Sequence, residues 1–303
     1  MKAKNGAIRL GFGCSFIPGP LTAREALTLL ETAFACGIRH FDTARMYGNG
    51  ESEGVLGELV RQRRDDISLV TKAGIEPPSR LARGLNKFAS AFKLAQAKPP
   101  AGRFEPDRIQ RSVETSLRAL KTDYIDALLL HEIRAHEVHD ELKRLLETLR
   151  ADGKIAAFGI ATSVEDSEAL ISAHPELCDI VQVPAQWLDR PRALPPNARL
   201  VLHSVLGARL TGFVNRLKAD ALLARRFHED SGLTPVDVVE IGRLMLQAAA
   251  YRNADGITLF STSRLERIRR NADLLTAKLD TPSMHALERA MRSLDGARHE
   301  TMS

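Results

Sequence analysis

The sequence predicts an α/β fold of the (β/α)8 class, a TIM barrel. Eight short apolar runs are nearly all separated by stretches with helical spacing, from one end of the chain to the other. Several of the runs are almost continuously apolar, which is typical of parallel strands covered on both faces. Neither a linker nor an internal repeat interrupts the alternation, so we predict one domain over residues 1–303, with long loops at the C-terminal mouth of the barrel.

The expected elements are given in chain order. The predicted strands are residues 8–11, 38–43, 67–72, 124–130, 156–160, 180–183, 200–203 and 257–260. The predicted helices are residues 23–36, 51–61, 107–120, 138–150, 164–172, 235–251, 264–277 and 283–293. Thr22 is a candidate cap of the first helix, and Gly37 is its expected stop. The stretches 73–106 and 207–234 are predicted to be long loops near the mouth.

Composition narrows the class of protein. The 303 residues are 44% hydrophobic and 27% charged, which is ordinary for a soluble globular protein. No apolar run reaches the roughly 18 residues needed to cross a bilayer, and the N-terminus lacks the apolar stretch of a signal peptide. The three cysteines are odd in number and lack metal-ligand spacing, which is typical of buried thiols in a reducing compartment. We therefore expect a cytoplasmic protein that neither binds a metal nor associates with a membrane.

The net charge of +5 is concentrated in one passage. Residues 79–103 contain six basic side chains and no acidic one. Nucleic-acid binding would also call for interleaved aromatic residues, and this passage has only Phe88 and Phe92, so we expect no nucleic-acid partner. Two interpretations stay open: a solvated loop, or a cover that attracts an anionic cofactor or substrate to the mouth.

Polar side chains gather at the predicted strand ends, which in a barrel meet at one mouth. Asp42 ends the second strand, with Tyr47 just beyond it, Lys72 ends the third and His131 follows the fourth. An isolated Asp at a strand end is more often a turn former, and an isolated Lys or His more often a rim or core residue. Four titratable groups on three consecutive strand ends favour an active site.

These four residue types fit one kind of chemistry. A phenol has an ordinary pKa of about 10, and a neighbouring ammonium lowers it by favouring the phenolate. Lys72 is the candidate for that cation, held by Asp42, and Tyr47 would then donate a proton to a carbonyl oxygen. No Cys or Ser stands beside them as a nucleophile, so we expect a borrowed one, such as the hydride of a nicotinamide.

The motifs around these residues make the chain resemble the aldo-keto reductase family. The matching residues are Phe41-Asp42-Thr43-Ala44, Tyr47-Gly48, Glu53, Leu56-Gly57, Thr71-Lys72, Asp123-Tyr124-Ile125-Asp126 and Leu129-Leu130-His131. The similarity continues through Gly153-Lys154-Ile155, Gly159-Ile160 and Val181-Gln182 to the Asn271 region, so it covers nearly the whole chain.

The resemblance implies a (β/α)8 barrel that uses NADP(H) without a Rossmann fold. It implies the catalytic set Asp42, Tyr47, Lys72 and His131, with Tyr47 as general acid in the reduction of an aldehyde or ketone. It places the nicotinamide near the sixth and seventh strand ends, with candidate contacts Thr162, Gln182, His203, Ser204 and Leu206. It places the adenosine 2′-phosphate end near Ser261, Thr262, Ser263, Arg267 and Asn271. Because an Arg can bond two phosphate oxygens at once, Arg267 favours NADP(H) over NAD(H).

The chain departs from the family pattern on the nicotinamide side. Ala161-Thr162 stand where the family usually has Ser-Asn, and Ala161 offers no side-chain hydrogen bond. His203 stands where a tyrosine usually stacks on the nicotinamide, and an imidazole has a smaller face and can titrate. Ala185-Gln186 stand where Tyr-Asn is frequent. The proton-transfer residues are unaffected by these departures.

Three functions remain open from the sequence. The first is an NADPH-dependent reductase of aldehydes or ketones, or the reverse dehydrogenase of an alcohol or sugar. The second is a non-catalytic NADPH-binding sensor, which the departures at Ala161 and His203 motivate. The third is a Schiff-base lyase using Lys72, which the nearby Asp42 disfavours because it keeps the amine charged. The sequence does not address the identity of the small-molecule substrate or the oligomeric state, and Trp187 fits a substrate wall or the core equally well.

Overall fold

The computed structural model describes residues 8–77, 103–190 and 192–299, with side chains up to residue 291. Eight parallel strands form a closed barrel in which each strand pairs with the next and β8 returns to β1. The strands are β1 (Leu10–Gly13), β2 (His40–Asp42), β3 (Ser68–Ala73), β4 (Ile125–His131), β5 (Ile155–Ala161), β6 (Ile180–Pro184), β7 (Arg199–His203) and β8 (Ile257–Phe260). The predicted (β/α)8 class is confirmed. A single domain over residues 1–303 stays a prediction.

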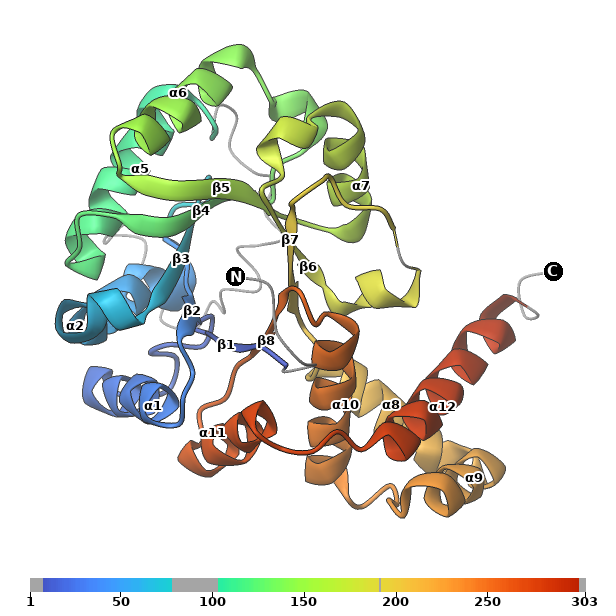
Figure 1. Ribbon diagram of the computed structural model, residues 1–303. Helices are drawn as coiled ribbons and strands as arrows, with labels where there is room; N and C mark the ends of the chain where they lie inside the picture. The colour runs from blue at the N-terminus through green and yellow to red at the C-terminus, as the bar shows by residue number, and fades with distance from the viewer. Residues whose placement is uncertain (1–7, 78–102, 191, 300–303) are drawn as a thin grey trace, which may run out of the picture.

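Helices surround the strands (Figure 1). They are α1 (Ala23–Ala35), α2 (Ser52–Arg63), α5 (Pro106–Leu120), α6 (Asp140–Ala151), α7 (Val164–Ala173), α8 (Ala208–Ala219), α9 (Ala221–Ser231), α10 (Val238–Arg252), α11 (Leu265–Ala272) and α12 (Thr281–His299). The expected cap of α1 is present, because the Thr22 side chain accepts from the Glu25 N–H and the Thr22 backbone N–H donates to the Glu25 carboxylate.

The predicted loop 207–234 is wrong, because it contains α8 and α9. The first of these buries Phe213, Val214 and Leu217, which is the spacing of an amphipathic helix. Gly212 and the turn residues that follow α9 weaken the pattern locally. Phe227 of α9 packs edge-on against Phe213, with ring centroids 5.4 Å apart, so tertiary packing supports both helices.

Strand alternation divides the core into two parts. Residues facing the helices form the larger apolar cluster, which includes Phe12, Phe41 and Leu69. Residues facing the barrel axis form a smaller cluster of Val70, Ala127, Leu129, Ala161, Ile180, Val201, Ile257 and Leu259. The axis is therefore filled with side chains and is not a pore. Beyond this apolar layer, the next side chains that face the axis are mostly polar, and they lie at the C-terminal mouth.

Gly57 allows two outer helices to approach closely. A Cβ at this position would lie 2.3 Å from the carbonyl oxygen of Ala119 on α5. Because α2 also contacts the turn that carries Tyr47, the close approach of α2 to α5 helps to place that turn. A packing requirement thus accounts for the glycine in the Leu56-Gly57 motif.

Candidate active site at the barrel mouth

A buried ion pair joins the ends of β2 and β3. Asp42 and Lys72 are 3% and 2% exposed, and the Lys72 ammonium donates to Oδ1 of Asp42 at 2.5 Å. The ammonium also donates to the carbonyl oxygen of Thr43 at 2.9 Å. Burial disfavours the ammonium, but the Asp42 carboxylate, with Tyr47, outweighs this and raises the pKa of Lys72. Lys72 is therefore a cation at neutral pH, which argues against Schiff-base chemistry.

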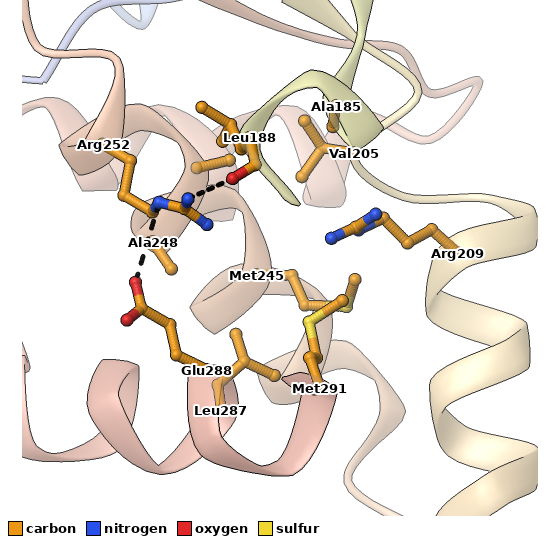
Figure 2. Close-up of a pocket in the computed structure, with 11 residues that line it drawn as sticks. Ala185, Leu188, Val205, Arg209, Met245, Ala248, Arg252, Leu287, Glu288 and Met291 are labelled. Carbon is orange, nitrogen blue, oxygen red and sulfur yellow. Dashed lines mark hydrogen bonds and ion pairs between the residues drawn. The ribbon is translucent and has the colours of Figure 1, made fainter. Parts of the chain in front are cut away.

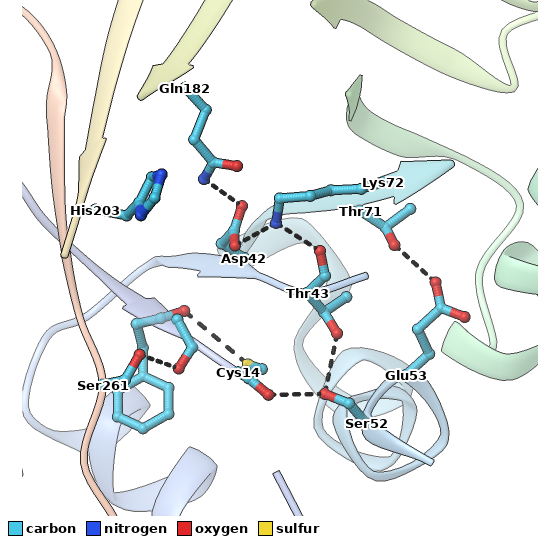
Figure 3. A network of polar contacts seen from close by, with 12 residues as sticks. Cys14, Asp42, Thr43, Ser52, Glu53, Thr71, Lys72, Gln182, His203 and Ser261 are labelled. Atoms are coloured by element: carbon cyan, nitrogen blue, oxygen red, sulfur yellow. Dashed lines mark hydrogen bonds and ion pairs between the residues drawn. The ribbon is translucent and has the colours of Figure 1, made fainter. Parts of the chain in front are cut away.

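Gln182 reaches the same carboxylate from β6. Its Nε2 donates to Oδ2 of Asp42 at 2.8 Å, so both carboxylate oxygens have a donor (Figure 3). The sequence predicted Gln182 as a nicotinamide contact, and the contact with Asp42 had no sequence signal, since 140 positions separate the two residues. The closed barrel brings them together.

Tyr47 lies over the ion pair at the start of a short 3-10 turn, η1 (Tyr47–Gly50). The Lys72 Nζ is 4.9 Å from the centre of its half-buried ring. Burial raises the pKa of Tyr47, against the charge of Lys72 and its hydrogen bond, which lower it. The sequence predicted the direction of the Lys72 effect but missed that burial exceeds it. The phenol accordingly stays protonated at neutral pH and can act as a proton donor.

His131, the last residue of β4, stands beside Tyr47. The two rings meet edge to face at 87°, with centroids 5.9 Å apart. Burial, reinforced by the positive charge of Lys72, lowers the pKa of His131 to about 3, so the imidazole is neutral. Its Nδ1 is buried and has no hydrogen-bond partner in the described part of the chain. His131 can thus offer a neutral hydrogen bond at the mouth but does not store a proton there.

A polar clamp, which the sequence reasoning missed, holds the loop that carries Tyr47. Arg45 forms an ion pair with the fully buried Glu53 at 2.8 Å and a longer one with Glu76 at 3.4 Å. Thr71, the neighbour of Lys72, donates to Glu53 at 2.7 Å (Figure 3). The clamp ties the loop after β2 to β3, so the phenol and the ammonium keep their relative position.

Arg103 closes the other flank of the mouth. Its guanidinium binds both carboxylate oxygens of Glu137, at 2.8 and 2.7 Å, and also donates to the carbonyl oxygen of Glu132. The backbone of Glu132 is left-handed (φ 56°), and its N–H donates to the carbonyl oxygen of Ala161 at 2.8 Å. As a member of the basic passage 79–103, Arg103 was expected in a solvated loop or a cover, but it is buried. The rest of that passage, up to residue 102, lies outside the described residues.

The seventh strand end approaches the ion pair with His203. Burial, with the charge of Lys72, lowers the pKa of His203 to about 4, while Asp42 acts in the opposite direction. Nδ1 of His203 lies 2.8 Å from the hydroxyl of Ser204, whose backbone is left-handed (φ 55°). Leu206, also predicted as a cofactor contact, is partly buried and packs against the larger apolar cluster that faces the helices. The structure therefore brings His203 close to the Asp42–Lys72 pair and turns Leu206 toward the helices.

The remaining predicted residues form a second group around β5, β8 and α11. Thr162 is buried, and its hydroxyl lies next to the Glu132 carboxylate, whose pKa burial raises and this hydroxyl lowers. Ser261 donates to the carbonyl oxygen of Gly13 at 2.7 Å, which uses its hydroxyl to close the barrel. Thr262 accepts from the Arg264 N–H at 3.2 Å, and Ser263 is exposed.

On α11, Arg267 is exposed and Asn271 is buried, one turn further along. Arg270 pairs with Glu266 at 2.9 Å, but no ion pair involves Arg264 or Arg267 among the described residues. No side chain caps the first N–H groups of α11 or of α8. These two helices follow neighbouring strands, so their uncapped N-termini start from adjacent parts of the mouth.

A separate pocket lies between η5 (Ala185–Asp189), α10 and α12 (Figure 2). Its two arginines have local partners. Arg252 donates to the carbonyl oxygen of Leu188 and lies 3.9 Å from Glu288, whereas Arg209 pairs with Asp189 at 2.7 Å. None of the predicted site residues lines it. Trp187 in η5 is a core residue, only 2% exposed.

Comparison with known proteins decides the family. The model of the aldo/keto reductase family matches residues 7–193, more than half of the chain. The chain belongs to the aldo/keto reductase family. The match includes Asp42, Tyr47, Lys72 and His131 and ends before β7.

Individual relatives agree with this assignment. The D-threo-aldose 1-dehydrogenase of a Pseudomonas species is 32% identical over 196 residues, 61% of this chain and 59% of the relative. The holo form of AKR11C1 from Bacillus halodurans has a TM-score of 0.68 at 20% identity, covering 94% of this chain and 92% of its own. An aldo-keto reductase from Klebsiella pneumoniae, solved in complex with NADPH, has a TM-score of 0.61 at 21% identity, covering 93% and 90%. The chain spans about half the length of the curated relatives it matches.

Two further findings concern the described residues alone. No helix there is both long enough and apolar enough to cross a membrane. No group of three or more His, Cys, Asp or Glu side chains within the same residues is arranged to hold a metal ion.

Proposed function

We propose that this protein is an NADP(H)-dependent oxidoreductase that interconverts a carbonyl group and the corresponding alcohol, with Tyr47 as general acid and base. The observation that carries the proposal is the convergence of a protonated phenol, a buried ammonium and a neutral imidazole on one barrel mouth. Membership of the aldo/keto reductase family supports the same reaction class.

The proton side of the reaction follows from the geometry. In the reductive direction Tyr47 gives its proton to the carbonyl oxygen, and the phenolate left behind is stabilised by the Lys72 ammonium. Asp42 keeps Lys72 charged and holds it in place. NADPH, when bound, would supply the hydride for the carbonyl carbon and become NADP+, and NADP+ would accept it in the reverse reaction. In the oxidative direction the phenolate takes the alcohol proton.

His131 has a separate role in this scheme. Because it is neutral and stands edge-on to Tyr47, it can hydrogen-bond the same substrate oxygen without competing for the proton. A neutral partner holds the oxygen in line with the phenol and leaves the proton transfer to Tyr47. We therefore assign orientation to His131 and proton transfer to Tyr47.

The residues around β5, β7 and β8 fit a dinucleotide with a 2′-phosphate. The Thr162 hydroxyl is buried next to the Glu132 carboxylate, where it can also bond an amide, and the N-termini of α8 and α11 have N–H groups without side-chain caps. Helix N-termini bind phosphates through such N–H groups. Arg264 and Arg267 are exposed, and neither forms an ion pair with a described residue, which suits a phosphate and favours NADP(H) over NAD(H). The Klebsiella neighbour, an NADPH complex, supports the same choice.

The substrate class rests on the relatives. The D-threo-aldose dehydrogenase supports an aldehyde, ketone, alcohol or sugar of small size. We also propose a cytoplasmic location, no nucleic-acid partner and no membrane association, on the grounds of composition.

Replacing one hydroxyl tests the proposal. Tyr47→Phe should lower carbonyl reduction with NADPH by about 10²–10⁴-fold, the usual contribution of a general acid, and leave NADPH binding unchanged by cofactor fluorescence. Tyr251→Phe is the matched control, because Tyr251 is 45% exposed on α10 and should keep full activity. Full activity of Tyr47→Phe across a panel of aldehydes, ketones and sugars would refute the assignment.

A second candidate is a sensor that binds NADPH without turning it over. The observation that favours it is the engagement of the Gln182 Nε2 by Asp42, which removes a donor from the expected nicotinamide site. Ala161, which has no side-chain donor, and His203, whose ring has a smaller face than a tyrosine, also weaken the expected nicotinamide site. NADPH binding with micromolar affinity, combined with no turnover of the wild-type protein on the panel, would select the sensor.

A further inference from the structure

Gln182 and Asp42 form a buried contact that the proposed reaction does not use. The role inferred for it below rests on the proposed function. β6 and β2 are not neighbours in the barrel, so this hydrogen bond crosses the mouth instead of following the sheet. The two residues are only 3% and 2% exposed. A buried carboxylate that loses a donor leaves an unpaired charged acceptor, which is costly, so the contact is held strongly.

The orientation of the amide is fixed by charge. A Gln side chain can present either NH2 or C=O, but only the NH2 end can face an ionised carboxylate without repulsion. Asp42 is the anion that keeps Lys72 charged. Nε2 is therefore held on Asp42, and what Gln182 has left for another group is an acceptor.

We propose that Gln182 is a positioning residue that holds Asp42, and through it Lys72, in register beneath Tyr47. With donors on both oxygens, the carboxylate cannot rotate about its χ2 bond without losing one of them. Its Oδ1 thus stays directed at Lys72, and the ammonium stays 4.9 Å from the centre of the phenol ring. Without Gln182, Oδ2 loses its donor, so more of the carboxylate charge acts on Lys72 and the ammonium stabilises the phenolate less.

The other titratable groups around the carboxylate are Cys14 at the end of β1, His40 on β2, His131 on β4 and His203 on β7. The pKa of His40 is lowered to about 4, chiefly by burial, as is that of His203, and the pKa of His131 is lowered to about 3. Burial raises the pKa of the Cys14 thiol far above its ordinary range. A change in the titration of Tyr47 in alkaline solution thus reports on the Asp42–Lys72 pair and not on these neighbours.

The chain allows Tyr47 to be titrated alone, without cofactor. It has three tyrosines, so a Tyr124→Phe/Tyr251→Phe background leaves Tyr47 as the single source of tyrosinate absorbance. Rapid jumps to alkaline pH, read within milliseconds, record ionisation before the protein unfolds. Gln182→Met, a replacement of similar shape, should move the Tyr47 midpoint upward by about half a pH unit or more, because the ammonium then favours the phenolate less.

Gln247→Met is the matched control. Gln247 is also buried and donates one hydrogen bond to a backbone carbonyl, that of Lys278 at 3.2 Å, but it lies on α10 away from the mouth. Its replacement should leave the Tyr47 midpoint where it is. An unchanged midpoint in Gln182→Met as well would overturn the proposal.

Gln182→Glu provides a second test, including the case in which Gln182→Met does not fold. A carboxyl group here can donate to Asp42 only when protonated, and two facing carboxylates cannot both ionise readily. We expect the thermal midpoint of this variant to lie closest to that of wild type in the most acidic buffer and to fall steeply as the pH rises. The slope should be shallower in Gln247→Glu, whose buried carboxyl faces a backbone carbonyl instead of a second carboxylate. A pH-independent difference from wild type would contradict the contact.

These outcomes are separable from the proposed function. Tyrosinate titration and thermal melting need neither substrate nor cofactor, so they can succeed in a protein with no reductase activity. If wild type reduces carbonyls, the alkaline limb of kcat against pH for alcohol oxidation should move upward in Gln182→Met together with the Tyr47 midpoint. A fall in kcat without that shift would indicate a merely structural role.

Discussion

The two sides of the barrel mouth are built differently. On the side of β2, β3 and β4, Asp42, Lys72, Tyr47 and His131 contact one another, and the Arg45–Glu53 clamp supports them. On the side of β5, β7 and β8, the polar groups share no common partner: the Thr162 hydroxyl lies beside Glu132, and the Ser261 hydroxyl donates to Gly13. The N-termini of α8 and α11 lack side-chain caps.

This difference reflects the role proposed for each side. Proton transfer requires a fixed distance and a fixed charge state, so its residues are organised before any ligand arrives. A cofactor that enters and leaves needs hydrogen-bond donors that the protein has not already used. The residues that bind it are therefore less connected to one another. On the first side, one substitution should therefore lower both stability and activity. On the second side, a substitution should mainly change the affinity for the cofactor.

Removing the buried cation should give the largest effect. Lys72→Met leaves Asp42 as a buried charge without its partner, and we expect a loss of about 3–5 kcal/mol in the free energy of unfolding. Carbonyl reduction should fall by at least about 10²–10⁴-fold, because the phenolate loses its counter-charge. Lys143→Met is the control, because its solvent-screened pair with Glu176 should contribute little to stability. Equal stability losses in the two variants would show that the first side is not preorganised.

Acid should destabilise the fold through three histidines, of which His40 and His131 lie on the side of β2, β3 and β4 and His203 ends β7. An unfolded histidine has a pKa of 6.5, whereas the folded pKa is about 3 for His131 and about 4 for His40 and His203. Between these values the unfolded chain binds protons that the folded chain does not. The free energy of unfolding is thus complete above pH 6.5 and falls below it, by up to about 1.4 kcal/mol per pH unit for each histidine.

Denaturant unfolding between pH 7 and pH 4 measures this slope. His131→Gln should flatten it most, because its folded pKa is the lowest of the three. His285→Gln, at an exposed position on α12, should leave it unchanged. A slope insensitive to His131→Gln would place the acid sensitivity elsewhere in the molecule.

Arg267 tests the second side. Arg267→Glu should weaken NADPH binding by roughly tenfold or more, as expected from the loss of a charge-assisted hydrogen bond, and should leave NADH affinity and protein stability nearly unchanged. Arg269→Glu on the same helix is the matched control, because two residues further along a helix point to nearly the opposite side. Cofactor fluorescence titration gives both dissociation constants, and equal losses for NADPH and NADH would exclude a 2′-phosphate contact.

Ser261 should give the smallest effect and divides the predicted cofactor set. Its hydroxyl donates to the Gly13 carbonyl, so Ser261→Ala should lower the free energy of unfolding by about 1 kcal/mol. NADPH affinity should change little, in contrast to Arg267→Glu. A large loss of NADPH affinity without a loss of stability would show that Ser261 contacts the cofactor.

Much of this architecture was predictable from local patterns. The apolar runs and their spacing predicted the strands within a few residues, and the Thr22 capping box was readable because its two partners are three positions apart. The helices α8 and α9 were missed because Gly212 and nearby turn residues obscure a pattern that packing between Phe213 and Phe227 supports. Local signals succeed where the stabilising partners are close in sequence.

The sequence by itself determined the barrel, the family resemblance and the four residues of the proton-transfer group, because strand ends in a parallel barrel must meet at one mouth. Only the tertiary structure decided that Gln182 holds Asp42, that Arg103 is buried against Glu137 and that burial outweighs Lys72 at Tyr47. The physical reason is the same in each case. Hydrogen bonds across the mouth and the loss of water depend on which distant side chains the closed sheet brings together, and no local pattern records that distance.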